Sequence, residues 1–312
     1  MSSLTPTPWI WRDGAFIPWA DATLHVLSHS MQFGSAAFEG IRAYATPQGP
    51  AIFRLREHLQ RLLTSVKIYR MELDFTLDQL VDACVETVAR NGLDSCYIRP
   101  MVVRGFGAAG MVPHGSPIHV FIPVWPWGTY LGEGALERGV AACITSWHRV
   151  APNTIPAMAK IAGNYLSGQL IKMEALANGY DEGIALSPAG TVSEGSGQNV
   201  FAVVDGILHT TPLDGTILGG ITRHTMITMA REAGLEVRET TIARETLYGA
   251  EELFVCGTAS EVTPVTSLDR IRIGTGTVGP ITRQLQQRYM AIVTGREPDV
   301  HGWLTRVPRA TA

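Results

Sequence analysis

Apolar side chains recur with a helical spacing in several parts of the chain, and six segments are predicted to be helices. Where the spacing is three or four positions, the apolar side chains share one helix face. Thr76 is a candidate N-cap for one helix, which ends at Asn91-Gly92. In another helix, a stripe that includes Leu166 and Met173 is expected to face the core. The predicted helices are residues 34–40, 55–69, 77–90, 164–178, 221–233 and 280–294.

Shorter runs rich in β-branched and aromatic residues are predicted to be strands. Asp13-Gly14 and Asp205-Gly206 are tight turns between neighbouring strands. Strands outnumber helices without a regular β-α-β alternation, so the expected fold class is mixed α/β (α+β). The predicted strands are residues 9–11, 15–18, 96–104, 118–124, 139–147, 183–187, 200–204, 207–210, 235–242, 252–256 and 261–267.

A run of Pro and Gly from Pro126 to Gly134 interrupts both spacings and is expected to join two domains. We therefore expect a smaller N-terminal α/β domain over residues 1–125, a linker over residues 126–137 and a larger domain over residues 138–312.

Composition limits the classes of function. The 312 residues are 46% hydrophobic with a net charge of −3, which allows a sizeable core and shows no clustered basic excess for nucleic acid. No apolar stretch approaches the roughly 20 residues of a membrane span. Residues 1–9 lack the pattern of a secretory signal, and four cysteines lack metal or CxxC spacing. We expect buried reduced thiols, no metal and a cytoplasmic protein.

The chain contains three lysines: Lys67, Lys160 and Lys172. Lys67 and Lys172 lie in amphipathic helices and are expected to be ordinary solvated lysines. Lys160 lies among small and apolar residues without a neighbouring charge. An ammonium there loses hydration and its pKa falls, which favours the neutral amine that a Schiff base needs. Local context leaves two readings open, a functional lysine and a lysine on a surface loop.

Three other segments are candidates for ligand binding. Gly219-Gly220 leads directly into a predicted helix, whose first amides favour a phosphate. Residues 257–260 form a second turn of small residues between two strands, a candidate anion nest. Glu194 is the sole charge in a Gly/Ser-rich segment, residues 191–199, expected to be a loop. Each alone also fits an ordinary connection.

Taken together, these motifs resemble those of the branched-chain amino acid aminotransferases of the class IV (fold type IV) pyridoxal-phosphate family. The resemblance runs from about residue 8 to about residue 305. It rests on Phe38-Glu-Gly-Ile-Arg42, Arg56-Glu-His-Leu-Gln-Arg61, Tyr97-Ile-Arg99-Pro, Pro126-Trp-Gly-Thr-Tyr130, Ala151-Pro-Asn-Thr-Ile-Pro156 followed by Lys160, Gly163-Asn-Tyr165, Ser193-Glu-Gly-Ser-Gly-Gln-Asn199, Gly220-Ile-Thr-Arg223 and Gly257-Thr-Ala259.

The resemblance implies a two-domain enzyme that binds pyridoxal 5′-phosphate at the domain interface. Lys160 would form the aldimine with the cofactor and carry the proton during a ping-pong transamination. Glu194 would face the pyridine nitrogen and Tyr165 would hydrogen-bond O3′. Four residues would hold the phosphate: Arg61, Ile221, Thr222 and Thr258.

The resemblance also implies the substrates, which are leucine, isoleucine or valine with 2-oxoglutarate, and a homodimer whose pockets draw on both subunits. Thr258, Ala259 and the Tyr97 hydroxyl would bind the α-carboxylate, and Arg99 would meet the side-chain carboxylate of glutamate. The expected substrate-binding residues are Phe33, Phe38, Gly40, Tyr97, Arg99, Trp127, Tyr130, Thr258 and Ala259.

Two positions depart from the family pattern. Phe33 stands where many relatives carry Tyr, so a hydroxyl for the glutamate carboxylate is missing at a cost of about 1–2 kcal/mol. Gln198 stands where the loop often has Glu, which removes a second carboxylate expected near Glu194.

Three alternative functions remain open on the same fold. The first is transamination of D-amino acids or (R)-amines, the second a lyase of the aminodeoxychorismate type, and the third binding of the cofactor without catalysis. The chirality of the accepted amine tests the first alternative, dependence on 2-oxoglutarate tests the second, and a half-reaction with leucine tests the third.

Overall fold

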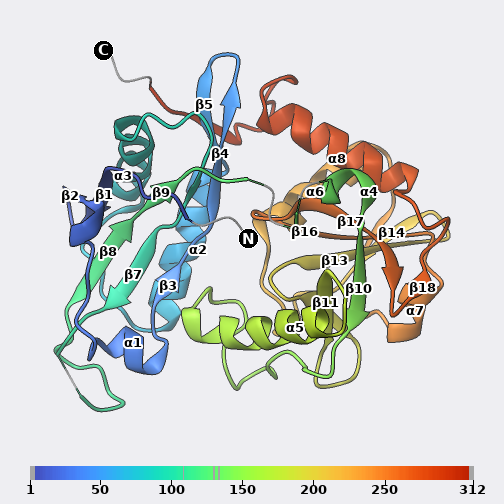
Figure 1. The fold of residues 1–312 in the computed structure, drawn as a ribbon, viewed down its shortest axis with the longest axis horizontal. Helices are drawn as coiled ribbons and strands as arrows, with labels where there is room; N and C mark the ends of the chain where they lie inside the picture. Colours follow the sequence, from blue (N-terminus) through green and yellow to red (C-terminus); the bar gives the residue numbers. More distant parts are fainter. Residues whose placement is uncertain (1–3, 108, 129–130, 133, 309–312) are drawn as a thin grey trace. The chain divides into compact units, whose positions relative to one another are not determined.

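The computed structural model describes residues 4–107, 109–128, 131–132 and 134–308, and every structural statement below refers to these residues. The chain forms two compact units. The first contains residues 1–128, 159–163 and 290–312, and the second contains residues 129–158 and 164–289. Figure 1 shows both units, with the segments of the first drawn mainly in blue and cyan.

The first unit contains two antiparallel five-stranded sheets and two long helices (Figure 1). One sheet has the strand order β2-β1-β8-β7-β3: β2 (Ala15–Pro18), β1 (Trp9–Arg12), β8 (Ile118–Ile122), β7 (Met101–Arg104) and β3 (Ala37–Phe38). The other has the order β19-β5-β4-β6-β9: β19 (Leu304–Arg306), β5 (Gly49–Phe53), β4 (Ile41–Thr46), β6 (Cys96–Ile98) and β9 (Val124–Trp125). The helical segments are η1 (Trp19–Asp21), α1 (His29–Phe33), α2 (Leu55–Ile68) and α3 (Leu77–Arg90).

Helices α2 and α3 pack their apolar faces into the core of the first unit. The buried stripe of α2 includes Leu55, Leu59 and Leu62, as its spacing predicts. Thr76 caps α3 through a capping box with Gln79, in which each side chain accepts a hydrogen bond from the other's backbone amide. These helices and their ends are therefore confirmed.

The second unit contains one mixed sheet with helices around it. Its main path is β12 (Val192–Gly195), β11 (Glu182–Leu186), β10 (Val140–Ile144), β17 (Glu261–Leu268), β16 (Glu252–Gly257), β13 (Asn199–Val204), β14 (Ile207–Thr210) and β15 (Val237–Glu239), with β18 (Ile271–Arg272) paired to β17. Its helices are α4 (Ala135–Arg138), α5 (Tyr165–Ala177), α6 (Ile221–Glu232) and α7 (Arg244–Tyr248). Two further helices, η2 (Ala162–Asn164) and α8 (Pro280–Val293), each include residues of both units. The fold is thus mixed α/β, as expected.

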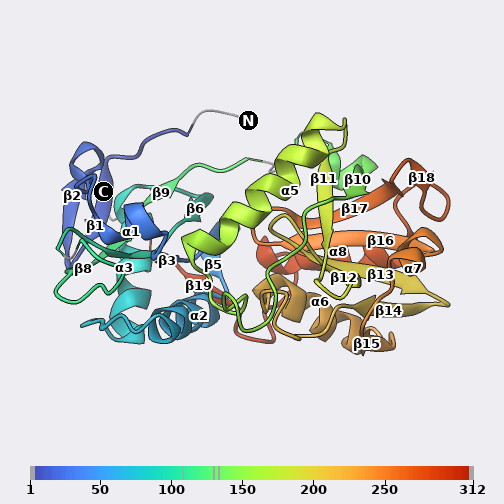
Figure 2. The same ribbon diagram turned by 90° about the horizontal axis from the view of Figure 1, so that it is seen from below.

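Helix α5 lies along β11, as Figure 2 shows, but it presents a different face from the one predicted. Its buried residues are Gly168, Ile171 and Ala175. The expected core stripe points outward, since Leu166 and Met173 are 62% and 64% exposed. The prediction that this stripe faces the core is wrong. Apolar spacing located the helix, but the small residues of the opposite face allow the closer approach to the sheet.

Two other predictions of local structure are wrong. Residues 34–40 do not form a helix, because α1 ends at Phe33 and Ala37–Phe38 form strand β3 against β7. The segment of residues 191–199 is not simply a loop, because β12 covers Val192–Gly195 and pairs with β11.

The division into units differs from the expected domain boundaries at two places. Residues 159–163 belong to the first unit because Ile161 forms a bridge with Ala37. Residues 290–312 also belong there, because β19 pairs antiparallel with β5. The first boundary, between residues 128 and 129, lies inside the expected linker.

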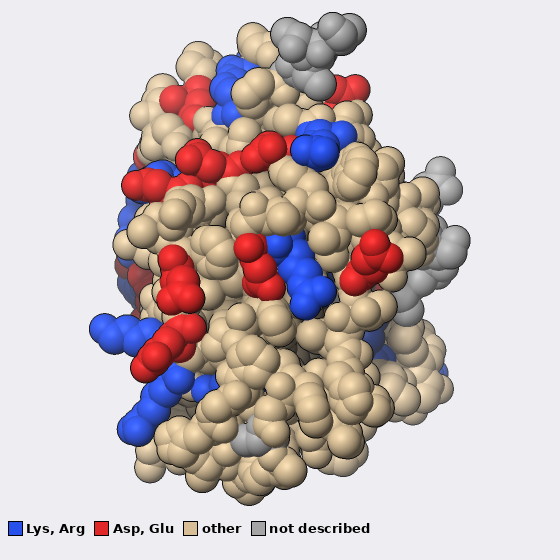
Figure 3. All heavy atoms as spheres, turned by 90° about the vertical axis from the view of Figure 1, so that its left-hand side faces the viewer, with Lys and Arg blue, Asp and Glu red and all other residues tan. Residues whose placement is uncertain are grey.

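The four cysteines are buried and unpaired thiols, as predicted. Among the described residues, none of the helices combines the length and the apolar character needed to cross a membrane. Figure 3 shows one face of the molecule, where acidic and basic side chains lie interspersed beside a broad uncharged area.

Candidate functional site

Lys160 is held in the first unit by its own backbone. Its amide N–H donates to Ser65 Oγ at 2.9 Å, and its carbonyl accepts from the Phe38 amide at 3.0 Å. The next residue, Ile161, forms the bridge with Ala37 at β3. The partly buried ammonium lies over the Phe38 ring, with Nζ 4.8 Å from the ring centroid. Lys160 is therefore anchored to secondary structure on both sides and is not a surface loop lysine.

The surroundings of Lys160 lower its pKa from 10.5 to about 8. Burial is the largest cause, because it disfavours the charged form. The carboxylate of Glu39 opposes the shift, while the cations of Arg61 and Arg99 add to it. The lowered pKa agrees with the effect expected from the uncharged sequence around this lysine.

The lowered pKa predicts a pH-dependent cost to the stability of the cofactor-free protein. Below about pH 8 the folded chain carries a desolvated ammonium, so Lys160→Met should raise the free energy of unfolding by about 1–3 kcal/mol. Between about pH 8 and 10.5 the unfolded chain binds the proton and the folded chain does not, so the wild type gains stability with rising pH. The difference in the free energy of unfolding between Lys160→Met and the wild type should therefore shrink between about pH 8 and 10.5. Denaturant titrations at pH 7 and pH 10 check this, and a gap that widens with pH would contradict it.

The residues expected to bind substrate form an aromatic group near Lys160. The Tyr97 ring lies 4.6 Å from the Trp127 ring, centroid to centroid. The guanidinium of Arg99 lies 4.8 Å from the Phe38 centroid and 5.2 Å from that of Tyr97. A Cβ on Gly40 would lie 1.9 Å from the Tyr97 hydroxyl oxygen, so a glycine is required there. The structure therefore brings these five residues of the first unit together.

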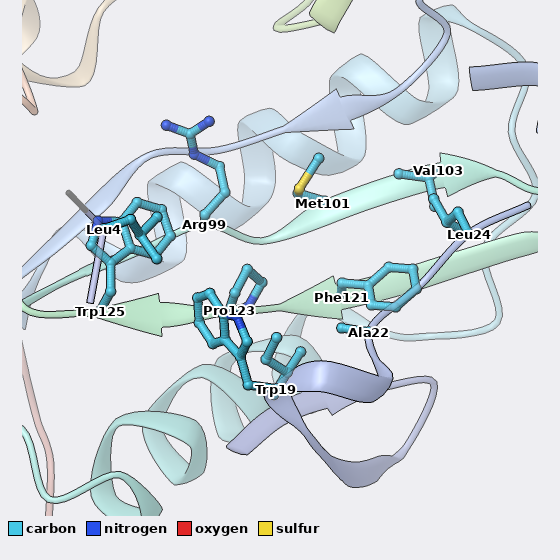
Figure 4. A pocket seen from close by; sticks show the side chains of 11 residues that line it. Leu4, Trp19, Ala22, Leu24, Arg99, Met101, Val103, Phe121, Pro123 and Trp125 are labelled. Carbon is cyan, nitrogen blue, oxygen red and sulfur yellow. The ribbon is translucent and has the colours of Figure 1, made fainter. Parts of the chain in front are cut away.

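An apolar pocket of about 340 Å³ extends along the sheet from Arg99 (Figure 4). Met101 and Val103 project into it from alternate positions of β7, and Phe121 from β8. The buried Nε of Arg99 has no hydrogen-bond partner among the described residues. An apolar wall with one cation at its end suits an amphiphilic anion better than a strongly polar ligand.

Phe33 and Tyr130 were also expected to bind substrate. Phe33 ends α1 and is 41% exposed, with its ring 4.6 Å from that of His29. Tyr130 lies outside the described residues.

Arg61 projects from α2 into a buried ion cluster that the sequence analysis missed. Its Nε donates to Glu39 Oε1 at 2.7 Å and its Nη2 donates to Glu39 Oε2 at 2.8 Å. His58 Nδ1 lies 2.8 Å from the same Oε2. Glu39 is fully buried, which opposes ionisation, but the Arg61 cation and the hydrogen bonds from Arg61 and His58 hold the pKa of its carboxyl far below the usual range.

Glu194 is the centre of a second group, in the second unit. It is buried on β12, and its Oε1 lies 2.7 Å from Arg149 Nη2. The other oxygen, Oε2, accepts from Asn199 Nδ2 at 3.3 Å and from the Leu218 amide at 3.1 Å. Three donors on a buried carboxylate favour its ionised form and fix its direction. Glu194 is not a solvated loop carboxylate.

The expected phosphate residues of the second unit lie at two backbone turns. Helix α6 begins at Ile221, directly after Gly220, so the first amides of the helix come from the predicted segment. A Cβ on Gly220 would lie 2.0 Å from Asn199 Oδ1, which explains the glycine by close packing. Thr222 is buried in the first turn of this helix.

The second turn joins β16 to β17 and contains Thr258 and Ala259, both partly buried. The buried Oγ of Ser260, in the same turn, has no hydrogen-bond partner among the described residues. Tyr165 is partly buried at the first position of α5.

Gln198 hydrogen-bonds a different buried carboxylate, that of Glu182. It donates to Glu182 Oε2 at 2.9 Å, and Lys172 Nζ lies 2.9 Å from the same oxygen. Glu182 is fully buried, so Lys172 is not the solvated lysine that was predicted. Lys172 balances the charge of this buried carboxylate and Gln198 donates a hydrogen bond to it, next to the segment that carries Glu194.

Glu39, His58 and Arg149 are thus polar residues of these groups that the sequence analysis did not select. Glu39 and His58 stand inside the quoted motifs, and their apolar surroundings were the available signal. Arg149 gave no such signal, because it lies 45 positions before Glu194 in a segment without regular spacing.

Comparisons with a family model, with curated proteins and with solved structures all point to the same family. The family model Amino-transferase class IV matches residues 36–268. The branched-chain-amino-acid aminotransferase of Escherichia coli (strain K12) is 48% identical over 300 residues, which cover 96% of this chain and 97% of that protein. The corresponding protein of Pseudomonas aeruginosa is 43% identical over 298 residues, with 96% and 97% covered.

Solved structures agree with this result. The crystal structure of the Escherichia coli branched-chain amino acid aminotransferase superposes with a TM-score of 0.95 at 47% identity and covers 97% of this chain and 100% of that one. The branched-chain amino acid aminotransferase of T.th., solved with pyridoxamine 5′-phosphate, has a TM-score of 0.94 at 45% identity, with 98% and 100% covered. The chain therefore belongs to the class IV aminotransferases and, within them, to the branched-chain-amino-acid aminotransferases.

Proposed function

We propose that the protein transfers an amino group between branched-chain L-amino acids and 2-oxoglutarate in a ping-pong reaction that depends on pyridoxal 5′-phosphate. The amino acids are leucine, isoleucine and valine. The observation that carries the proposal is Lys160, an anchored and partly buried lysine with a pKa of about 8 in a chain of this family. Amino-group exchange between leucine and 2-oxoglutarate, followed with the purified protein and added cofactor, tests it.

The residues present fit a phosphorylated cofactor. The orphaned Ser260 hydroxyl, in the turn with Thr258, offers a donor to an anion. The first amides of α6 offer further donors, and the tight contact of Gly220 with Asn199 holds that helix start in place. We propose that Arg61, Ile221, Thr222 and Thr258 bind the phosphate.

Bound pyridoxal 5′-phosphate supplies an aldehyde that takes up the amino group and a ring that withdraws electrons from the substrate α-carbon. Lys160 would hold the cofactor through its amine and would move the proton from the substrate Cα. Its lowered pKa makes the neutral amine that a general base requires far more accessible near neutral pH than in an ordinary lysine.

The remaining polar residues hold protons and orient the reactants. Glu194, paired with Arg149, would hold a proton on the pyridine nitrogen. Tyr165 would donate a hydrogen bond to O3′. The amides of Thr258 and Ala259 and the hydroxyl of Tyr97 bind the α-carboxylate.

The aromatic residues Phe38, Tyr97 and Trp127 line the side-chain end of the proposed substrate site. Apolar walls favour aliphatic side chains by excluding water. Arg99 offers the buried Nε and its charge to the side-chain carboxylate of glutamate. A D-amino acid or (R)-amine scope is not favoured, and an assay with L- and D-leucine distinguishes the two.

Phe33→Tyr is expected to improve the glutamate half-reaction. A tyrosine hydroxyl would add a hydrogen bond to the side-chain carboxylate, worth about 1–2 kcal/mol, so KM for glutamate should fall about 5- to 30-fold. Leucine has no side-chain carboxylate, so its KM should stay within about twofold. Steady-state kinetics with each amino donor measures both values. Equal changes for leucine and glutamate would remove Phe33 from the glutamate site.

We propose that the protein acts as a homodimer in the cytoplasm. Exposed apolar side chains gather on the first unit around α1 and the segment between β7 and β8, where the His25 and Phe106 rings lie 4.5 Å apart. Met31 and Met111 are 73% and 78% exposed in these two segments. Such a patch supports association with a second copy. Sedimentation at micromolar concentration tests this assembly.

A further inference from the structure

Glu39 is the most deeply buried acid near Lys160, and the proposed reaction gives it no task. It lies between β3 and β4, where its amide donates to the Pro100 carbonyl at 2.8 Å. Its carboxylate accepts two parallel hydrogen bonds from one edge of the Arg61 guanidinium, at 2.7 and 2.8 Å. This two-point contact fixes the plane of the guanidinium as well as its position. The other guanidinium edge consequently has one defined direction.

His58 completes the cluster from the same helix, one turn before Arg61. It is buried with 1% exposure, and its Nδ1 lies 2.8 Å from Glu39 Oε2. Burial is the largest effect on the pKa of His58 and, with the cations of Arg61 and Lys160, lowers it although Glu39 opposes the shift, which favours a neutral ring. An ionised carboxylate cannot donate a hydrogen bond, so Nδ1 carries the ring proton. Glu39 is therefore held from two positions of α2 and cannot turn away from Arg61.

The cluster is poorly explained by stability alone. Removing charges from water costs several kcal/mol per ion, and buried ion pairs are often no more stabilising than well-packed apolar side chains. What the cluster does supply is a fixed orientation for an arginine that would otherwise have several rotamers.

We propose that Glu39 is a positioning residue, which aims the Arg61 guanidinium at the cofactor phosphate. This inference rests on the proposed function and adds a residue to it. Glu39 itself would not touch the cofactor. Its effect should therefore depend on the phosphate group of the ligand and on the presence of Arg61.

Charge provides a second, separable effect. Glu39 raises the pKa of Lys160 and Arg61 lowers it, so the electrostatic effects of these two residues on the lysine partly cancel. Glu39→Gln removes the anion and leaves the cation, so the pKa of Lys160 should fall further. Glu39→Asp keeps the charge but shortens the side chain by one methylene group, which shifts the guanidinium and leaves most of the field.

The test compares two ligands of the cofactor-free protein, pyridoxal 5′-phosphate and pyridoxal. Equilibrium binding is measured for the wild type, Glu39→Gln, Glu39→Asp and the control Glu57→Gln. Glu57 lies on α2, the helix that carries Arg61, and its Oε1 lies 2.7 Å from Arg54 Nε. Both Glu39 variants should bind pyridoxal 5′-phosphate about 10- to 100-fold more weakly, since an aimed charge-assisted hydrogen bond is lost. Binding of pyridoxal should change less than about threefold, and Glu57→Gln should match the wild type.

A double-variant cycle tests whether the effect passes through Arg61. If it does, Glu39→Gln combined with Arg61→Gln should bind pyridoxal 5′-phosphate no more weakly than Arg61→Gln alone. Additive losses, or equal losses for both ligands, would overturn the inference.

Glu39→Asp keeps the test decisive if Glu39→Gln does not fold, because it retains the buried charge balance. If Glu39→Asp binds pyridoxal 5′-phosphate as tightly as the wild type does, the orientation of the Arg61 guanidinium is unimportant and the inference is overturned. If the wild type binds neither ligand, the proposed function itself fails. If the wild type binds pyridoxal 5′-phosphate and both Glu39 variants bind it equally well, only the positioning role is refuted.

Discussion

Replacement of Lys160 by alanine should reduce transamination by more than about 10⁴-fold, because the change removes both the covalent anchor and the proton carrier. The protein should still fold, since the backbone of Lys160, not its side chain, makes the contacts with Ser65 and Phe38. Stopped-flow absorbance of the bound cofactor after addition of leucine measures the loss. Borohydride reduction of the wild type should attach the cofactor to the peptide that contains Lys160.

The small number of lysines makes the control simple. Lys67→Ala replaces an exposed lysine of α2 and should leave the rate within about twofold. Partial recovery of the Lys160→Ala variant by an added alkylamine would support the role as proton carrier. A Lys160→Ala protein with near wild-type turnover would refute the central assignment.

Glu194→Gln should reduce the rate of the leucine half-reaction by about 10²–10³-fold, because it removes the charge that we propose lies opposite the pyridine nitrogen. The same change leaves the Arg149 guanidinium buried without its carboxylate partner, so stability should also fall by about 3–5 kcal/mol. Rapid-reaction kinetics and denaturant unfolding measure the two effects separately.

A double variant separates catalysis from folding at this position. Glu194→Gln with Arg149→Met removes both charges, so stability should largely recover while the rate stays low. Glu232→Gln alters an exposed ion pair with Arg288 and should change neither quantity. Full recovery of the rate in the double variant would contradict the role of Glu194 at the ring nitrogen.

Sequence periodicity predicted helix positions well but was less reliable for their orientation. The boundaries of α2 and α3 followed from one clear apolar stripe and a capping box. In α5 the same kind of stripe is exposed, because Gly168 approaches the Ser196 carbonyl so closely that a Cβ would lie 2.2 Å from it. Periodicity reports which residues share a face, and tertiary packing decides which face is buried.

The candidate site shows a similar limit. Lys160 stood out because uncharged neighbours are visible in the sequence. The pairing of Glu194 with Arg149 and of Glu39 with Arg61 depends on long-range contacts for which no local spacing exists. The motifs located the two turns that we propose bind the ligand, whereas the buried ion pairs of Glu194 and Glu39 needed the three-dimensional structure.

The first unit is assembled from three separate stretches of chain, and this has a consequence for synthesis on the ribosome. Strand β5 obtains β19 as its partner only after residues 304–306 have been made, about 250 positions later. The second unit needs no residue beyond 289. Although the first unit contains most of the early sequence, it should be the last to complete its folding during translation. Until then the edge of β5 is open, and a chaperone that covers exposed strand edges would act on this unit.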